Sequence, residues 1–436
     1  MKKNYYQIHE EITDNSFLYM NTMNESFLFI DKYANDIYTK NEDVNSINTN
    51  FPQLYEVMRK MDFIVPDDYN EKEIVKQRRR NEQYDESLYH IIVNPTLSCN
   101  LSCWYCYEHK NQNSRISLDI LEGIKRHIVF HYHHHPYKEL KLSFFGGEPF
   151  MYFDAIISIC NFANSFCKDN GIRLLLDFTT NGTLLTEERL KLLKDFTCTF
   201  QITIDGSHDR HNKIKFTKDH LMDTYRTTIN NFFLIQHIIP YSFIYVRINF
   251  DGNTLKYLDS ILDDLELLDR IRTIVILKKI WQVNSFLKNK ELVRNAIENI
   301  FDRGFMIDYY TQGYLCFGER KNEVVINYDG NIFKCTTINS FDKANSFGVL
   351  DTNTGKIIWN ETKLETLYSA VTADKCFMCK MYPICYGPCN FHLLSGDSNC
   401  YLETLDLSKK EYLMFMYKQR MMNNLIYKTK QKKYSI

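Results

Sequence analysis

The stretch SerCysAsnLeuSerCysTrpTyrCysTyr (residues 98–107) decides how this 436-residue chain is interpreted. It follows an apolar run (residues 91–93) and places cysteines at Cys99, Cys103 and Cys106. Three thiolates on one short loop can hold three irons of a [4Fe–4S] cluster and leave the fourth iron without a protein ligand. An open iron can bind and reduce a small molecule, so the spacing predicts catalysis. A zinc knuckle or a partial set of disulfides is the alternative that the spacing alone leaves open.

The aromatic residue before the last of these cysteines, Tyr105, completes a CxxxCxxC motif that resembles the signature of radical S-adenosylmethionine (SAM) enzymes. The resemblance implies that Cys99, Cys103 and Cys106 hold a [4Fe–4S] cluster whose open iron binds SAM. It also implies that Tyr105 lies at the SAM site. In that family, SAM is split to a 5′-deoxyadenosyl radical, which abstracts hydrogen from C–H bonds.

A glycine motif further along the chain, PheGlyGlyGluPro (residues 145–149), resembles the second motif of the family. We expect Gly146 and Gly147 to expose backbone at the end of a strand, because a side chain there would block the close approach of a ligand. The resemblance implies that Glu148 accepts a hydrogen bond from the SAM amino group.

Three further matches follow in the order that the family has them. ThrThrAsnGlyThrLeuLeu (residues 179–185) closes an alternating strand and supplies Asn181 to the SAM site. PheGlnIleThrIleAspGly (residues 200–206) reads as a strand that ends in a turn, and the resemblance implies that the Thr203 hydroxyl contacts the SAM ribose. An ordinary strand threonine is the alternative. Where relatives carry an Arg for the SAM carboxylate this chain has Lys215, which keeps the charge but loses the bidentate fork.

Seven more cysteines gather in the C-terminal third. Their spacing resembles the SPASM extension of peptide-modifying radical SAM enzymes, which carries two auxiliary [4Fe–4S] clusters, so three clusters and SAM are expected in all. The resemblance implies that the distal cluster is fully ligated by Cys376, Cys379, Cys385 and Cys400. It assigns the nearer cluster to Cys316, Cys335 and Cys389. Some relatives supply a fourth thiolate where this chain has Tyr310, so we expect an open or non-cysteine site on the nearer cluster.

The remaining cysteines, Cys160, Cys167 and Cys198, lie in apolar contexts and are predicted to be small core residues. Iron–sulfur clusters need a reducing compartment. The N-terminus has no apolar signal segment, and no uninterrupted run of about 18 apolar residues exists. We therefore expect a cytoplasmic protein that does not contact a membrane. The formal net charge of −1 also argues against nucleic acid as a partner.

Six apolar, strand-like runs alternate with helical patterns from residue 88 onward and predict an α/β fold with a parallel sheet. The runs are residues 91–93, 142–145, 174–178, 200–204, 245–250 and 273–277. Relatives close such units into a partial (β/α)6 TIM-like barrel, whose reactive groups follow the C-terminal ends of the strands.

Residues 1–70 contain no cysteine and none of these motifs. A strand pattern at residues 26–30 and helical patterns at 32–38 and 51–61 resemble the winged-helix element that binds leader peptides in many ribosomal-peptide maturases. There the leader adds a strand to the sheet edge. This segment contains twelve Asp or Glu and six Lys or Arg, so its net charge is negative, which disfavours contact with the phosphates of DNA. A packing extension of the catalytic domain is the alternative.

The predicted domain order has five parts. These are a winged-helix-like element (residues 1–70), a linker helix (71–87), the radical SAM partial barrel (88–300), the SPASM Fe–S domain (301–404) and a basic C-terminal helix (405–436). That last helix is expected to cap the fold with a solvated face.

A histidine-rich run, HisIleValPheHisTyrHisHisHis (residues 127–135), holds five of the thirteen histidines. The i,i+4 spacing of His127 and His131 allows a metal site, but we expect the end of a helix followed by a solvated loop.

The motifs together predict a radical SAM/SPASM maturase that installs a thioether or carbon–carbon crosslink in a ribosomally made precursor peptide. The expected partners are a precursor peptide with a leader and a flavodoxin- or ferredoxin-type electron donor. An anaerobic sulfatase maturase, which forms formylglycine, is the first alternative. In that subfamily an Asp follows the second auxiliary cysteine and a Gln precedes the GlyGly pair, whereas this chain has Thr336 and Phe145 there. A non-catalytic metal-cluster interaction protein is the second alternative.

Overall fold

The computed structural model describes residues 1–106, 111–280, 290–309, 315–338, 340–370, 374–396 and 400–434. It divides into two compact units. The unit that we call the barrel unit comprises Tyr84–Tyr309 and Phe317–Thr366. The terminal unit comprises Met1–Gln83, Tyr310–Cys316 and Leu367–Ile436.

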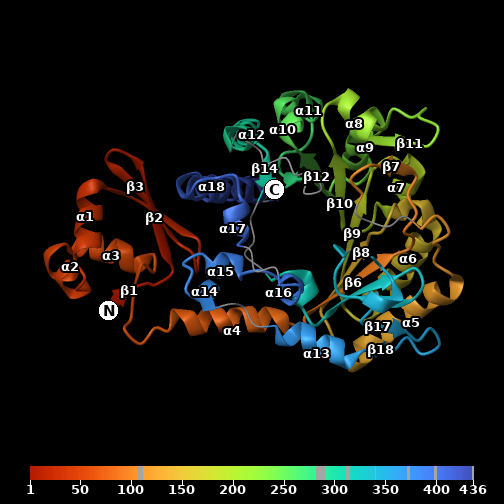
Figure 1. Cartoon of the computed structure of the whole chain (residues 1–436), viewed down its shortest axis with the longest axis horizontal. Coiled ribbons are helices and arrows are strands. Elements are labelled where there is room, and N and C mark those ends of the chain that lie inside the picture. The colour runs from red at the N-terminus through yellow and green to blue at the C-terminus, as the bar shows by residue number, and fades with distance from the viewer. Residues whose placement is uncertain are drawn as a thin grey trace. The chain divides into compact units, whose positions relative to one another are not determined.

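A parallel sheet is the centre of the barrel unit (Figure 1). Its six main strands lie side by side in chain order and pair in parallel, so all six predicted strands are confirmed. They are β6 (Leu88–Asn94), β8 (Glu139–Phe144), β9 (Arg173–Thr180), β10 (Cys198–Ile204), β12 (Phe243–Phe250) and β13 (Thr273–Lys279). Helices between them return the chain for the next parallel strand: α5 (Leu118–His134), α6 (Phe153–Asp169), α7 (Glu187–Leu193), α9 (Thr224–Ile238), α10 (Gly252–Lys256) and α11 (Leu258–Asp264).

The sheet continues beyond both ends of this series. After α12 (Lys290–Asp302), β14 (Met306–Asp308) pairs in parallel with β13, and β15 (Glu323–Asn327) pairs in parallel with β6. Three antiparallel strands then complete the sheet: β16 (Asn331–Phe333), β17 (Gly348–Leu350) and β18 (Ile357–Trp359). The predicted domain boundary at residue 300 stays a prediction, and residues 317–366 belong to the barrel unit. The physical reason is that β15 is buried along its whole length and pairs with an otherwise unpaired strand edge.

The two faces of the sheet differ in polarity because successive strand residues point to opposite sides. On one face the rings of Phe144, Phe178 and Phe200 stack with centroid separations of 5.5 and 5.1 Å, and all three are fully buried. On the other face Thr203 and Arg247 occupy neighbouring positions of β10 and β12. The polar face is the one that can receive a polar ligand.

The histidine-rich run forms the last turns of α5, so the expectation of a solvated loop is wrong for His127 and His131. The Nε2 atom of His127 lies 2.5 Å from the Tyr89 hydroxyl and its Nδ1 atom 2.7 Å from the Gly355 carbonyl oxygen. The ring of His131 stacks on Tyr89 at 3.6 Å. His127 is a core residue and His131 is half-buried, because this face of α5 lies against Tyr89 of β6.

We expect His127 to make the protein sensitive to acid. Burial lowers the pKa of His127 from 6.5 to about 4, so the unfolded chain binds a proton that the folded chain excludes. The contribution of His127 to stability is therefore fully present above pH 6.5, and it falls by about 1.4 kcal/mol for each pH unit as the pH drops toward 4. Urea unfolding at several pH values measures the slope, and His127→Gln should flatten it; an unchanged slope in that variant would refute the assignment.

One segment, Pro149–Asp169, is long and apolar enough to cross a membrane by length and composition. It comprises a 3-10 turn (Pro149–Tyr152) and α6. Its buried residues include Ile156, Ile159 and Ala163, and α6 packs on β9, β8 and α5. The apolar composition of the segment is thus accounted for by its place against the sheet.

The terminal unit begins with a three-stranded antiparallel sheet covered on one face by helices. Its strands are β2 (Gln7–Thr13), β3 (Ser16–Asn21) and β4 (Ser26–Asp31), and its helices are α1 (Lys32–Lys40), α2 (Val44–Asn50) and α3 (Pro52–Lys60). Tyr19, Tyr38, Ile47, Met58 and Phe63 form the core between them. The predicted strand and both predicted helices are present, and the linker helix is α4 (Glu71–Gln83).

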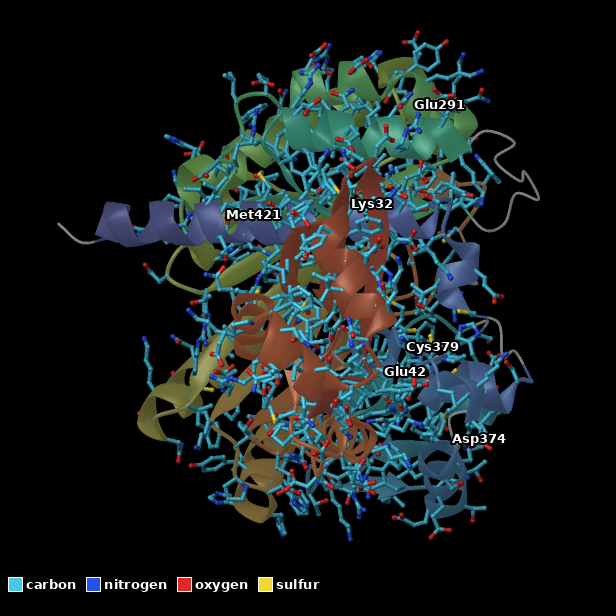
Figure 2. All side chains as sticks on the ribbon, turned by 90° about the vertical axis from the view of Figure 1, so that its left-hand side faces the viewer. Lys32, Glu42, Glu291, Asp374, Cys379 and Met421 are labelled. Atoms are coloured by element: carbon cyan, nitrogen blue, oxygen red, sulfur yellow. The ribbon has the colours of Figure 1, made fainter. Side chains whose placement is uncertain are left out.

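The C-terminal helix α18 (Lys409–Tyr434) packs against the same small sheet (Figures 1 and 2). The Tyr417 ring meets Phe27 and Phe29 edge-on at 5.7 and 5.1 Å. Lys410 donates a hydrogen bond from Nζ to the Ile12 carbonyl oxygen at 2.8 Å. The two ends of the chain therefore build one unit.

The N-terminal segment also holds the segment around the predicted distal-cluster cysteines. Three side-chain hydroxyls donate to backbone carbonyl oxygens between Cys376 and Met381: Tyr5 to Met378 (2.7 Å), Tyr6 to Phe377 (3.2 Å) and Thr22 to Lys380 (2.6 Å). Both segments belong to the terminal unit, and the predicted bounds of the winged-helix-like element and of the Fe–S domain stay a prediction.

Candidate active site

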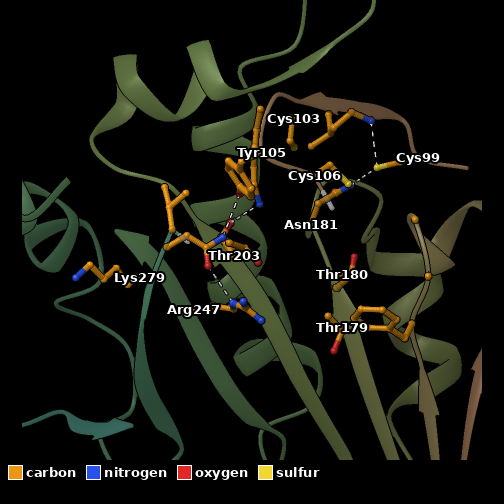
Figure 3. A pocket seen from close by; sticks show the side chains of 17 residues that line it. Cys99, Cys103, Tyr105, Cys106, Thr179, Thr180, Asn181, Thr203, Arg247 and Lys279 are labelled. Atoms are coloured by element: carbon orange, nitrogen blue, oxygen red, sulfur yellow. Dashed lines mark hydrogen bonds between the residues drawn. The ribbon is translucent and has the colours of Figure 1, made fainter. Parts of the chain in front are cut away.

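A pocket in the barrel unit, at the C-terminal ends of its strands, collects the residues that the motifs single out (Figure 3). Nine of the ten residues predicted for the cysteine loop and the SAM site line it: Cys99, Cys103, Tyr105, Cys106, Gly146, Gly147, Asn181, Thr203 and Lys215. The exception is Glu148. All six main strands contribute residues to the lining, either from the strand itself or from the segment that follows it, as parallel strand ends in a barrel do.

The cysteine loop is fixed by pairing with a distant segment. β7 (Leu101–Cys103) pairs antiparallel with β11 (Lys215–Thr217), and Lys215 stands directly opposite Cys103. On the other side of the loop, Asn181 donates to the Asn100 side-chain oxygen at 2.8 Å and its Nδ2 atom lies 3.8 Å from the Cys99 sulfur. Two strand ends therefore position this loop.

The glycine pair lies against the backbone that leads into the cysteine loop. Gly147 donates its N–H to the Thr96 carbonyl oxygen at 3.1 Å, and Glu148 donates its N–H to Ser98 at 2.9 Å. A Cβ atom would stand 2.2 Å from the Thr96 oxygen at Gly146 and 2.1 Å from the Ser98 oxygen at Gly147. The close approach that requires glycine here is thus between two backbone segments of the protein, and not only with a ligand as we expected.

Glu148 is fully buried behind the lining residues. One carboxylate oxygen accepts from the Thr180 hydroxyl (2.7 Å) and the Phe150 N–H (3.1 Å), and the other accepts from the Asn181 N–H (2.8 Å). Burial raises the pKa of this carboxyl, and these hydrogen bonds oppose the increase. In this structure Glu148 positions Thr180 and Asn181, whereas its direct contact with the SAM amino group stays a prediction.

A buried polar network joins the cysteine loop to the strand ends, and its centre, Asp205, was not predicted as a site residue. The Oδ2 atom of Asp205 accepts from the Tyr105 hydroxyl at 2.7 Å and lies 3.3 Å from Lys215 Nζ. Asn249 donates to the same hydroxyl at 3.1 Å. Burial, and then Asp205, raise the pKa of Tyr105, so this phenol stays protonated and acts as a donor.

Further lining residues on β12 and β13 were also missed: Arg247, Asn249, Lys279 and Ile280. The signal was present in the sequence. In TyrValArgIleAsnPhe (residues 245–250), Arg247 and Asn249 alternate with apolar residues, so both point to the polar face of the sheet.

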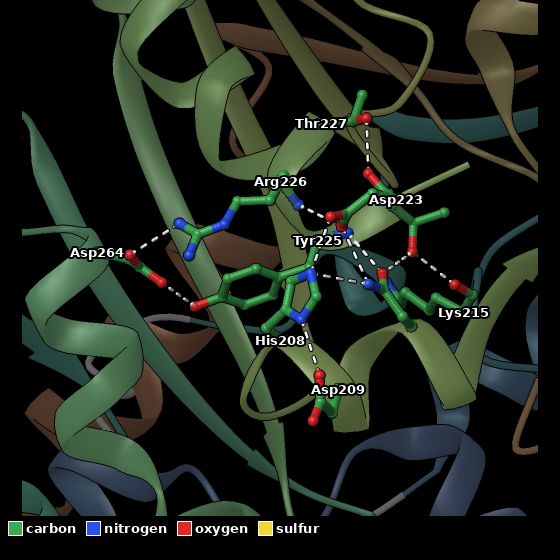
Figure 4. Close-up of polar contacts among 10 residues, drawn as sticks. His208, Asp209, Lys215, Asp223, Tyr225, Arg226, Thr227 and Asp264 are labelled. Carbon is green, nitrogen blue, oxygen red and sulfur yellow. Dashed lines mark hydrogen bonds and ion pairs between the residues drawn. The ribbon is translucent and has the colours of Figure 1, made fainter. Parts of the chain in front are cut away.

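The backbone of Lys215 is anchored at the first turn of α9 (Figure 4). The Thr224 hydroxyl donates to the Lys215 carbonyl oxygen at 2.6 Å, and the Asn212 side chain accepts from the Tyr225 N–H at 2.9 Å. Asp223 caps α9 and accepts from the Asn212 amide at 2.9 Å. Lys215, which stands opposite the cysteine loop, is therefore held by both its side chain and its backbone.

Four of the auxiliary cysteines belong to the terminal unit. Burial raises the pKa of the Cys376 thiol first, and the nearby thiols of Cys385, Cys400 and Cys379 raise it further. These are the four residues assigned to the distal cluster. Cys160, Cys167 and Cys198 are buried in the barrel unit, as expected of core cysteines.

The nearer-cluster residues are divided between the units: Cys316 and Cys389 lie in the terminal unit and Cys335 in the barrel unit. Tyr310 lies outside the described residues. Among the described residues, no group of three or more His, Cys, Asp or Glu side chains is gathered closely enough to hold a metal ion. The assignment of all ten cysteines as cluster ligands therefore stays a prediction.

Comparison with known proteins identifies the class. The sequence profile of the Radical SAM superfamily matches residues 93–265, which contain the cysteine loop, the glycine pair, Thr203 and Lys215. A solved structure of anSMEcpe with bound AdoMet and the Cp18Cys peptide superposes with a TM-score of 0.58 over 78% of this chain and 99% of that chain, at 17% identity. The barrel unit thus has the radical SAM fold.

Two curated relatives are similar over most of their length. The cysteine-type anaerobic sulfatase-maturating enzyme of Clostridium novyi is 23% identical over 347 residues, which is 70% of this chain and 88% of that protein. The radical SAM cyclopropyl synthase TigE of Paramaledivibacter caminithermalis is 21% identical over 423 residues, 87% of this chain and 83% of that protein.

Residues 93–265 of the chain match the Radical SAM superfamily. This match implies one [4Fe–4S] cluster and SAM. The lining residues suit both groups, because three thiols share one loop and backbone and amide groups surround the space beside them.

Proposed function

We propose that this enzyme is a SPASM-type peptide maturase that installs a crosslink, either a thioether or a carbon–carbon bond, in a ribosomally made precursor peptide. The observation that carries the proposal is that one chain has both the pocket lined by the cysteine loop and a second cysteine set in the terminal unit. That set is Cys376, Cys379, Cys385 and Cys400. The relatives named as maturases or as a cyclopropyl synthase support it.

The chemistry requires two hydrogens to leave the peptide for each crosslink. SAM bound at the cluster supplies the radical that takes one hydrogen atom; the second leaves as a proton with one electron. Cys316, Cys335 and Cys389 would hold the auxiliary cluster that accepts this electron. With Tyr310 in place of a fourth cysteine, a substrate thiolate could bind there, which favours a thioether.

The small sheet of the terminal unit supports recognition of a leader peptide. β4 is the last strand of the order β2–β3–β4, so its outer edge offers unpaired backbone groups among the described residues. A leader could add a strand to this edge. A flavodoxin- or ferredoxin-type protein would supply the electrons, and the reducing cytoplasm would keep the clusters intact.

Formation of formylglycine on a sulfatase is the second candidate, because the similarity to the Clostridium novyi enzyme favours it. Thr336 follows Cys335 and is nearly buried, and a hydroxyl cannot replace a carboxylate base at neutral pH. Phe145 lines the pocket where that subfamily has Gln. These two positions argue for a different peptide reaction.

Co-expression with the peptide encoded by a small open reading frame beside this gene tests the proposal. Mass spectrometry should show the loss of two hydrogens per modification, and the Cys103→Ala enzyme should leave the peptide unmodified. An exchange of oxygen for sulfur with net oxidation would instead support formylglycine formation, and an unchanged peptide would contradict both.

A further inference from the structure

We propose that Arg247, and not Lys215, binds the carboxylate of SAM in this pocket. The inference rests on the proposed SAM site and changes the residue that recognises the ligand's negative charge. Lys215 was predicted for this role because it stands where relatives carry Arg. The structure gives Lys215 other partners, whereas no described residue bonds to the terminal nitrogens of Arg247.

Lys215 is committed to the protein. Its Nζ atom lies 3.3 Å from Asp205 Oδ2 and donates to the Thr203 carbonyl oxygen at 3.3 Å, and the residue is 4% exposed. Asp205 is fully buried, so its carboxylate and the Lys215 ammonium need one another as partners. A ligand carboxylate would have to compete with Asp205 for this amine.

Arg247 is positioned on the pocket side of β12, directly opposite Thr203 on β10. Its Nε atom donates to the Asn249 side-chain oxygen at 3.0 Å, which fixes the plane of the guanidinium. In the part of the chain that the structure describes, the terminal nitrogens of Arg247 have no hydrogen-bond or ion-pair partner. Two parallel donors are therefore left for a ligand.

The charge of the pocket points to an anionic group on that ligand. The described lining residues include three cations, Lys215, Arg247 and Lys279, and no carboxylate. Figure 3 shows the Arg247 side chain extending from its strand into the space between Thr203 and the pair Thr179 and Thr180. Lys279 lies at the exposed end of β13, so of these two strand residues Arg247 is the cation that lies further inside the pocket.

A guanidinium fork matches the two oxygens of a carboxylate, whereas an ammonium is a point charge. Lys215 stands where relatives carry Arg, and this change removes the bidentate geometry. Arg247 restores that geometry from another strand, β12. Asn249 links this residue to the Tyr105 hydroxyl, so the same chain of hydrogen bonds also reaches the cysteine loop.

Binding of SAM and of decarboxylated SAM to the anaerobic holoenzyme tests the inference without requiring turnover. In the wild type, SAM should bind more tightly. In Arg247→Gln this preference should shrink by about tenfold to a hundredfold, because hydrogen bonds between charged groups contribute that much. The remaining preference would come from the iron. Arg247→Lys should retain part of the preference for SAM over decarboxylated SAM. Lys278→Met, which removes an adjacent cation outside the lining, should retain the full preference.

Iron content and the absorbance of the clusters report whether each variant is folded and contains its clusters. If Arg247→Gln does not fold or lacks its clusters, Arg247→Lys provides a second measurement. An unchanged preference in both Arg247 variants, or its loss in Lys215→Met alone, would overturn the assignment. A wild-type holoenzyme that binds neither compound would instead contradict the SAM site itself, so the two failures are distinguishable.

Discussion

Gly147→Ala is expected to abolish assembly of the SAM-binding cluster and, with it, cleavage of SAM. The added methyl group would stand 2.1 Å from the Ser98 carbonyl oxygen and 2.7 Å from that of Leu97. Both atoms are backbone, so no flexible side chain can give way, and the segment directly before Cys99 must move. The hydrogen bond from Gly147 to Thr96 would be strained by the same shift. Iron and sulfide content and the electron paramagnetic resonance signal of the reduced cluster measure the loss.

Gly171→Ala is the matched control. Gly171 has a φ of +67°, yet nothing lies within 4 Å of an added Cβ atom. The substitution should cost about 1 kcal/mol of backbone strain and leave the clusters intact. If Gly147→Ala assembled all its clusters and cleaved SAM at the wild-type rate, contact between the glycine pair and the cysteine loop would not be a structural requirement.

Asp205→Asn should strongly destabilise the barrel unit and weaken SAM binding. Replacing the fully buried carboxylate removes the partner of Lys215, which is itself buried, and an uncompensated buried charge costs about 3–5 kcal/mol. The Tyr105 hydroxyl would lose its charged acceptor, so the aromatic residue of the cysteine loop would lose its fixed position. Chemical denaturation and SAM titration measure the two effects.

Asp264→Asn is the control for this variant, because Asp264 also accepts from a tyrosine hydroxyl and pairs with a cation (Figure 4). Its partners are Tyr225 and Arg226, and its side chain is 28% exposed, so the loss should stay within about 1 kcal/mol. Asp205→Asn combined with Lys215→Met should recover stability relative to Asp205→Asn alone. Equal losses at Asp205 and Asp264 would contradict the importance of burial.

The sequence was sufficient to predict the barrel strands and most of the pocket. Each strand is an apolar run, and each motif follows such a run, so parallel pairing alone brings Gly146, Asn181 and Thr203 to one edge of the sheet. These are local patterns joined by a topological rule, which is why they could be predicted from one sequence.

The features that were missed depend on contacts between segments distant in the chain. β15 joins β6 across more than 200 residues, and β11 pairs with the cysteine loop. No local pattern specifies either pairing. The same holds for Glu148, whose three donors come from two segments, and for Asp205, which meets Tyr105 and Lys215 only after folding. Long-range backbone pairing therefore set the limit of prediction.

The domain boundaries show this limit in another form. Residues 1–70 were predicted as a winged-helix-like element from their strand and helix patterns. Tyr5, Tyr6 and Thr22 nevertheless donate to the backbone of residues 377–380, and α18 packs on the small sheet. Hydroxyl groups that reach distant carbonyl oxygens leave no periodic signal in a sequence.

Incubation of the anaerobically reconstituted enzyme with SAM and dithionite tests the central claim most directly. We expect 5′-deoxyadenosine in the wild type and none when Cys103 is replaced by Ala, because we propose that the cysteine loop holds the cluster that binds SAM. Absence of 5′-deoxyadenosine from a wild-type protein with full iron content would contradict the account.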